Sequence, residues 1–236
     1  ELGEGYGLAE GGLGLGAGFS VVSGKDARHD NHPYVNQLFF GENGGPASPE
    51  CDGWVTYGIP VVAGLMYRDS IEIDELSYPI HVKEVKLMKD EEGAGCNRGA
   101  PGVTLTYGPS QNPMTVVFAA DAQVNPAKGV RGGKEGNRGE MHVIDSDGNA
   151  TQAPSVGVVV LNKGMWLKGK DTSGGGYGCP FERDAGRVLH DVLEGYISLE
   201  RAKKIYGVVF EGSVEEEDLE VNLEKTLELR SSTFKD

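Results

Sequence analysis

Glycine constrains this chain more than any other residue. It makes up 37 of the 236 residues, about twice the usual frequency of roughly 7%. Glycine is costly inside long helices and suits turns and places where two backbones come very close. The first 18 residues are especially rich in it, so we expect irregular backbone there, followed by a first strand at Phe19–Val22.

A β pattern follows from Tyr34 to Val160. Short runs rich in β-forming residues alternate with Gly, Pro, Asn and Asp at intervals of roughly 8 to 15 residues, which is typical of an all-β sandwich or meander. The predicted strands lie in VNQLFF, WVTYGIPVV, IHVKEVKLM, VTLTYG, MTVVFAA, MHVI and SVGVVVL. With the first strand, this gives about eight. Asp147-Gly148, between MHVI and the later VGVVVL, is the strongest hairpin signal because Asp-Gly tolerates the positive φ angles of a tight turn.

The composition changes after Lys170, where a glycine loop precedes a helical pattern. Asp184 can cap a first helix whose Val188, Leu189, Val192 and Leu193 share one face, ending at Gly195. A second helix is predicted from a Ser198 cap to Gly207.

The final stretch is strongly acidic, so we expect an exposed arm or short helix there. We therefore predict a mainly β chain with a short C-terminal helix pair, α+β overall. Its predicted parts are a glycine-rich β domain at 1–170, a loop plus helix pair at 171–210, and an acidic arm at 211–236.

Charge excludes several classes of partner. Lys and Arg total 22 against 36 acids, and the formal net charge of −14 repels nucleic acids and anionic lipid surfaces. No apolar run approaches the roughly 18 residues of a membrane span, and the first residues lack the features of a signal peptide. The three cysteines are an odd number without a CxxC pair. We expect a cytoplasmic protein with no nucleic-acid or membrane partner.

His29 and His32 are the candidate metal ligands. They lie near Asp26 and Asp30 in KDARHDNHPY, and imidazole with carboxylate suits zinc, manganese or iron. Pro33 favours extended backbone before it, however, and isolated motifs of this kind are weak. We favour a polar loop and expect no catalytic metal in this chain.

A second candidate is VRGGKEG. Arg131 beside Gly132 and Gly133 could present a guanidinium to a carboxylate or phosphate, although a surface turn accounts for these residues equally well. Cys179 precedes a predicted helix that could lower the pKa of its thiol, but without a histidine placed beside it we interpret it as structural. No catalytic residue is assigned.

The strongest candidate is the segment from Gly174 to Asp184, predicted to shape an interface or site. Gly174, Gly175 and Gly176 fit a fixed loop that a neighbouring backbone or ligand approaches closely, with positive φ expected at Gly175. The candidate residues that follow the glycines are Tyr177, Phe181, Glu182 and Arg183: the two rings can anchor the loop, and the two charges can make polar contacts. A flexible linker is the alternative.

Several segments of the sequence also resemble the hydantoinase B/oxoprolinase family. The most specific block is TSGGGYGCPFERDAGRVLHDVLEGYISLERAKKIYGVVF, which is similar to that family's C-terminal signature. Further similarities lie in SGKDAR with YVNQLFFGENGG, in YPIHVKEVKLMKDEEGAGCNRGAPGV and in VNPAKGVRGGKEGNRGEMHVI. The resemblance covers about residues 16 to 225. Cys179 stands where the family often has Asp, and residues 51–75 differ from the usual hydantoinase sequence.

The resemblance implies a role in an ATP-dependent complex. This chain would be the C-terminal portion of a hydantoinase B-type subunit, whose N-terminal half and a hydantoinase A-type ATP-binding subunit would be its partners. ATP and Mg would bind the partner subunit, and a divalent metal, Zn or Mn, would lie in the complex but not in this chain. The implied reaction is opening of cyclic amides such as hydantoin or 5-oxoproline. The alternatives are carboxylation of ketones such as acetone and acetophenone, and a non-catalytic scaffold or interaction domain.

Overall fold

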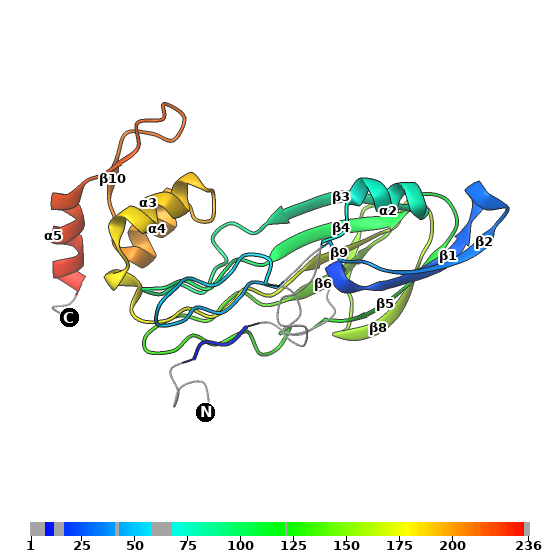
Figure 1. Ribbon diagram of the computed structural model, residues 1–236, viewed down its shortest axis with the longest axis horizontal. Helices are drawn as coiled ribbons and strands as arrows, with labels where there is room; N and C mark the ends of the chain where they lie inside the picture. Colours follow the sequence, from blue (N-terminus) through cyan, green and yellow to red (C-terminus); the bar gives the residue numbers. More distant parts are fainter. Residues whose placement is uncertain (1–7, 12–16, 41–42, 58–67, 121, 234–236) are drawn as a thin grey trace.

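The computed structural model describes residues 8–11, 17–40, 43–57, 68–120 and 122–233. Their strands form two larger antiparallel sheets and a two-stranded hairpin. Figure 1 shows an elongated molecule with the two larger sheets at one end, helices α3, α4 and α5 at the other, and extended segments between them. The mainly β chain with a C-terminal helix pair is confirmed.

The two sheets differ in strand order. The first has the order β2-β1-β5-β8. Its strands are β1 (Val21–Asp26), β2 (His32–Gln37), β5 (Met114–Ala119) and β8 (Val156–Leu161). The second has the order β3-β4-β9-β6-β7. Its strands are β3 (Ile80–Leu87), β4 (Val103–Pro109), β6 (Glu140–Ile144), β7 (Ala150–Gln152) and β9 (Trp166–Lys170).

Both sheets bury side chains in one hydrophobic core, so they form a sandwich. On β5 the alternate residues Met114, Val116 and Phe118 are buried, while Val117 points outward and is 44% exposed. The residues that face the same core from the second sheet are Leu105, Tyr107, Met141 and Leu167. This alternation is what a half-buried antiparallel sheet requires.

Five predicted strands are confirmed as β3, β4, β5, β6 and β8. VNQLFF is only partly a strand, because β2 already ends at Gln37. The first strand begins later than predicted: Ala17–Phe19 forms a 3-10 helix, η1, and β1 begins at Val21.

The strand predicted in WVTYGIPVV is wrong for residues 54–57, and residues 58–67 lie outside the described residues. The cause is local. Trp54 O accepts a hydrogen bond from Gly45 N, and Tyr57 N donates to Asn43 O, so this segment pairs with a glycine-rich stretch rather than with a sheet.

The predicted Asp147-Gly148 turn is confirmed, with a different partner strand. Gly148 has φ of 90°, and Asp145 Oδ1 accepts from the backbone N–H of Asp147 and Asn149. The turn joins β6 to the short strand β7, whereas VGVVVL forms β8 in the other sheet.

Helix α2 and strand β9 have no counterpart in the sequence prediction, and neither do the short strands β7, β10 and β11. Helix α2 (Ile71–Ser77) is capped by Ser70, whose side chain accepts from Ile73 N, and Ile71 packs against the sandwich core. Strand β9 lies between β4 and β6 and completes the second sheet.

The C-terminal helix pair forms as predicted. Helix α3 (Ala185–Leu193) is capped by Asp184, and helix α4 (Leu199–Tyr206) by Ser198, with Gly207 in the left-handed region at φ of 64°. One expectation is wrong: Leu193 is 51% exposed, because the buried face of α3 centres on Val188 and Val192.

The acidic stretch packs onto the helix pair. It forms a hairpin of β10 (Phe210–Glu211) and β11 (Glu220–Val221), followed by helix α5 (Leu223–Thr233), which confirms the short helix. Leu219 joins the helical core, and Arg230 of α5 donates to the carbonyl oxygens of Tyr206 and Arg183. The predicted division at residues 170 and 210 stays a prediction. No helix in the described ranges is long and apolar enough to cross a membrane.

Candidate functional site

Residues 173–178 lie at the centre of a set of extended segments, which we call the glycine bundle (residues 43–47, 93–100, 127–136 and 173–178). The backbone N–H groups of residues 174, 175, 176 and 177 donate, in order, to the carbonyl oxygens of Ala100, Glu10, Lys134 and Asn97. The first and fourth acceptors belong to the same neighbouring segment. The direction of bonding therefore repeats every three residues, as in an extended helix with three residues per turn.

This packing leaves no room for side chains at three consecutive positions. A Cβ on Gly174 would lie 1.9 Å from Gly45 O, one on Gly175 would lie 2.1 Å from Lys128 O, and one on Gly176 would lie 2.2 Å from Ala94 O.

The predicted close approach is thus confirmed, but the positive φ expected at Gly175 is wrong. The glycines are needed because other backbones surround them on every side, and all three are buried.

The structure brings the two predicted glycine segments together. Tyr177 forms a parallel bridge with Val130, and a Cβ on Gly133 would lie 2.1 Å from Gly176 O. The side chain of Arg131 is exposed, and Arg131 and Gly132 both have positive φ, 52° and 94°. Val130 to Gly133 thus form a turn whose inner residue packs on the bundle and whose arginine faces outward.

Arg183 is the most heavily bonded of the predicted site residues. Its side chain is 1% exposed and spans two carboxylates. Nη1 and Nη2 donate to Asp52 Oδ1 and Oδ2 at 2.7 and 2.8 Å, and Nε donates to Asp191 Oδ2 at 3.0 Å. Nη1 also donates to the carbonyl oxygen of Cys96 at 3.1 Å. The guanidinium therefore joins helix α3 to two segments of the chain that lie far from it in the sequence.

Two further arginines complete this ion-pair cluster. Arg98 Nε donates to Asp191 Oδ1 at 2.8 Å, and its guanidinium lies 4.6 Å from the centre of the Tyr196 ring. Arg187 contacts Asp52 Oδ1 at 2.8 Å. Asp191 is fully buried, so its charge depends on the Arg98 and Arg183 partners.

Asp52 shows the electrostatic effect of the cluster. Burial opposes ionisation, but the hydrogen bond from Arg183 and the charges of Arg183 and Arg98 lower the pKa of Asp52 to about 2. Asp52 is therefore an ionised structural partner at neutral pH and is unsuited to act as a general acid.

Glu182 and Tyr177 remain predictions as site residues. Glu182 is exposed, and its backbone carbonyl lies 3.7 Å from the Sγ of Cys96. Tyr177 is half-buried, and both its N–H and its C=O bond to Asn97. Phe181 packs beside Gly207, close to where a Cβ on that glycine would lie, consistent with an anchoring ring.

The histidine pair does not assemble a metal site. His29 and His32 are exposed and line a shallow hollow with Asp26, Tyr34 and Tyr78. Asp26 instead accepts from Arg28, whose hydrogen bonds lower its pKa to about 2. In the described ranges no group of three or more His, Cys, Asp or Glu side chains is placed to hold a metal ion, so we derive no step through a metal here.

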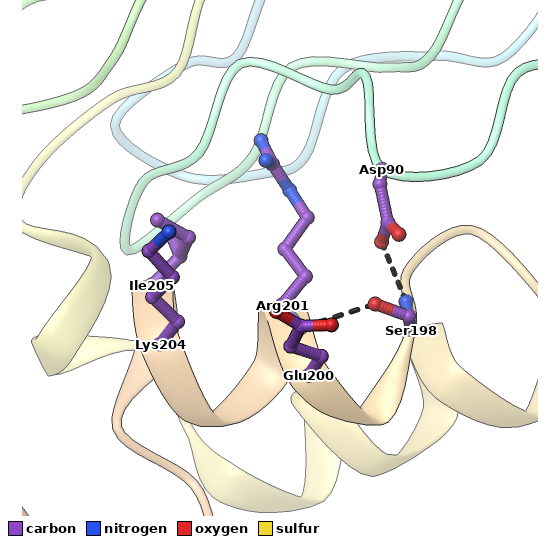
Figure 2. Close-up of a pocket in the computed structure, with 6 residues that line it drawn as sticks. All are labelled: Asp90, Ser198, Glu200, Arg201, Lys204 and Ile205. Carbon is purple, nitrogen blue, oxygen red and sulfur yellow. Dashed lines mark hydrogen bonds between the residues drawn. The ribbon is translucent and has the colours of Figure 1, made fainter.

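A cavity of about 250 Å³ lies where the turn at Asp90 meets helix α4. Figure 2 shows Arg201 extending from α4 toward that turn, and Asp90 accepting from the backbone N–H of Ser198 at 2.6 Å. Arg201 Nε donates to the buried carboxylate of Glu92 at 2.8 Å. The arginine thus ties helix α4 to Glu92, which directly precedes the bundle segment 93–100.

Comparison with known proteins shows the family to which this chain belongs. Residues 11–180 match the hydantoinase B/oxoprolinase family. The chain belongs to this family. It is 32% identical over 197 residues to the beta subunit of the caprolactamase of Pseudomonas jessenii, covering 81% of this chain and 34% of that protein. It is also 32% identical over 165 residues to the B subunit of a putative D-/L-hydantoinase from a Pseudomonas species, strain NS671, covering 69% and 27%.

Solved structures agree with the family assignment. The ATP-dependent caprolactamase of Pseudomonas jessenii superposes with a TM-score of 0.73 at 26% identity, covering 94% of this chain and 38% of that one. A nucleotide-free acetone carboxylase superposes with a TM-score of 0.71 at 18% identity, covering 92% and 33%, and shares the fold alone. The present chain spans about a third of the length of the relatives that it matches.

Arg183 was a candidate from the sequence, and its role as a site residue stays a prediction; the other members of its ion-pair cluster were missed. Asp52, Arg98, Arg187 and Asp191 were not among the candidates. Asp52 lies 131 positions from Arg183, and no local spacing links the two. The available signal was Asp191 inside the apolar stripe of α3, where a charged residue needs a partner.

Proposed function

We propose that this chain is the C-terminal part of a hydantoinase B-type subunit in an ATP-dependent multisubunit enzyme that opens a cyclic amide. The observation that carries the proposal is the relation to the caprolactamase beta chain over 81% of the present chain. The similarity to the putative hydantoinase supports it, because lactams and hydantoins share the cyclic amide bond.

Within that enzyme the chain acts as a rigid frame. The glycine bundle excludes side chains from its centre, and the Arg183 cluster ties it to helix α3, so the exposed turns at either end are held in fixed positions. Fixed positioning of substrate-contacting or partner-contacting groups is a large part of what a protein contributes to catalysis.

The groups that activate the amide are assigned to the rest of the enzyme. ATP and Mg are proposed to bind the hydantoinase A-type subunit, and a divalent metal, Zn or Mn, to lie outside this chain. Arg131 is the proposed contact from this chain to a carboxylate or phosphate group, because its side chain is exposed on a backbone turn that the bundle holds in place.

The assay uses the assembled enzyme: this chain, the remainder of its subunit and the A-type subunit. ATP hydrolysis and product formation are measured with caprolactam, hydantoin, 5-oxoproline, acetone and acetophenone, each with and without bicarbonate. We expect a ring-opened product and ATP consumption with a cyclic amide, unaffected by bicarbonate. Bicarbonate-dependent carboxylation of a ketone would replace the proposal with a ketone carboxylase, and no turnover of any of them would favour a scaffold without catalysis.

A further inference from the structure

Strand β8 and its neighbour β5 carry an exposed apolar face. Val156, Val158 and Val160 point outward from β8 and are 72%, 64% and 55% exposed. Val117 of β5 pairs with Val158 and extends the same surface. We call these four residues the β8 valine patch.

β8 is also the edge of its sheet. Among the described residues it is hydrogen-bonded only to β5, and Figure 1 places it at the outer margin of the sandwich. Its six residues, VGVVVL, contain neither proline nor charge. An apolar edge strand with no such protection is a template for pairing with another strand.

The opposite edge of the same sheet is built differently. Strand β2 reads HPYVNQ. Pro33 removes one backbone donor, which is a usual means of keeping an edge strand unpaired, and His32 and Asn36 make the strand more polar than β8. One sheet therefore has a protected edge at β2 and an unprotected edge at β8.

We propose that β8 pairs with an extended, apolar segment from the part of the hydantoinase B-type subunit that lies outside this chain. The relatives have room for that segment: this chain spans 34% of the caprolactamase beta chain and 38% of the solved caprolactamase chain. The inference rests on the proposed function, because it needs the longer subunit, but it does not depend on the proposed reaction.

The size of the patch favours a segment of the same subunit over a second copy. A fully buried valine side chain removes about 60–120 Å² of apolar surface from water. A strand paired at the β8 edge would flank Val156, Val158 and Val160 but not Val117 of β5, so these three supply at most on the order of 300 Å². A stable interface between separate chains buries about 800 Å² per partner. A segment already held in the same subunit does not lose translational freedom on pairing, so a smaller contact is sufficient.

Hydrogen exchange in the assembled enzyme tests the pairing without any substitution. The amides of residues 156–161 are compared with those of residues 32–37 at the other edge of the sheet. We expect the β8 amides to exchange at least about tenfold more slowly than the β2 amides. Equal rates at the two edges would overturn the proposal.

A matched pair of variants tests the patch. Val158→Lys places a charge on the patch, and Val35→Lys places one on a similarly exposed position, 69%, of the protected edge strand. We expect at least a tenfold loss of assembled enzyme for V158K and no change for V35K. Equal tolerance would contradict the proposal, and if V158K fails to fold, the exchange experiment on the unsubstituted enzyme still decides.

The occupant is identified by a photo-crosslinking amino acid at position 158 of the assembled enzyme. We expect crosslinks to a peptide of the same subunit outside these 236 residues. Crosslinks to β8 of a second copy, or to the A-type subunit, would overturn the assignment. These readouts are independent of turnover, so a wrong substrate would not affect them.

Discussion

Arg183 and Asp52 form a two-point ion pair across 131 positions of the sequence, with both oxygens of the carboxylate bound at 2.7 and 2.8 Å. Asp52 lies shortly after the bundle segment 43–47. Arg183 immediately precedes Asp184, the cap of α3. The pair therefore fixes the helical end of the molecule against the glycine bundle. Its removal is expected to loosen this joint.

Arg183→Met is expected to destabilise the protein by about 3–5 kcal/mol, because it leaves the buried carboxylate of Asp191 with one fewer cation. Arg183→Lys retains the charge but cannot bond both carboxylates, so an intermediate loss is expected. Urea unfolding measures both. Arg131→Met, at an exposed arginine, is the control and should change stability by less than about 0.5 kcal/mol. A wild-type stability for R183M would show that the ion pairs of Arg183 contribute nothing.

Gly175→Val should abolish assembly of the enzyme while the sandwich stays folded. The new Cβ would lie 2.1 Å from the backbone oxygen of Lys128, which the fixed bundle cannot accommodate. We expect a loss of at least about 3 kcal/mol in the stability of the bundle. Gly186→Ala, on the exposed side of α3, is the matched control: its Cβ would meet only the side chain of Asp184, at 3.1 Å, so it should cost far less than G175V. Normal assembly and turnover of G175V would mean that the segment is only a spacer.

The stability contributed by Asp52 should disappear in acid. Its pKa is lowered from the ordinary 3.8 to about 2 in the folded protein. The contribution is therefore fully present above about pH 4 and is lost as the pH falls toward about 2. Unfolding free energies of wild type and Asp52→Asn, measured across this range, should converge at low pH. A difference that is independent of pH would contradict the assigned charge.

Asp74 should show the opposite pH dependence. Burial, together with the charge of Asp69, raises the pKa of Asp74 to about 6, and one of its carboxylate oxygens is buried without a hydrogen-bond partner. Stability should therefore fall as the pH rises through about 4 to 6 and remain lower at neutral pH.

Asp74→Asn should remove that dependence and stabilise the protein at pH 7 by about 1 kcal/mol. Thermal unfolding at several pH values measures the effect. Glu200→Gln, at an exposed position of helix α4, should leave the pH dependence in place. The same slope in D74N as in wild type would exclude Asp74 as its source.

The elements that could be predicted from the sequence are those set by local residue patterns. The Asp184 and Ser198 caps were predictable because each bonds within three residues of itself. Strand β9 was missed because WLKGK alternates weakly and carries Gly169, which packs against Ala17. Helix α2 was missed because its Ile73 and Leu76 are exposed, so no clear apolar stripe marks it.

The candidate site was predictable only in part. Three adjacent glycines indicated that other backbones come close at Gly174–Gly176, but not which ones, because the neighbours come from four separate parts of the chain. The partners of Arg183 were equally hidden, since their contacts are set by the tertiary fold rather than by spacing.

Residues 173–178 are translated after the segments to which they bond. Their hydrogen-bond partners include Glu10, Ala47, Ala100 and Val130, all of which leave the ribosome earlier. Those segments therefore wait without their common neighbour until most of the chain has been translated. Contacts of such long sequence separation form slowly, because the connecting loops must first be closed. The backbone groups that residues 173–178 will bond are therefore left to water for most of the translation of this chain.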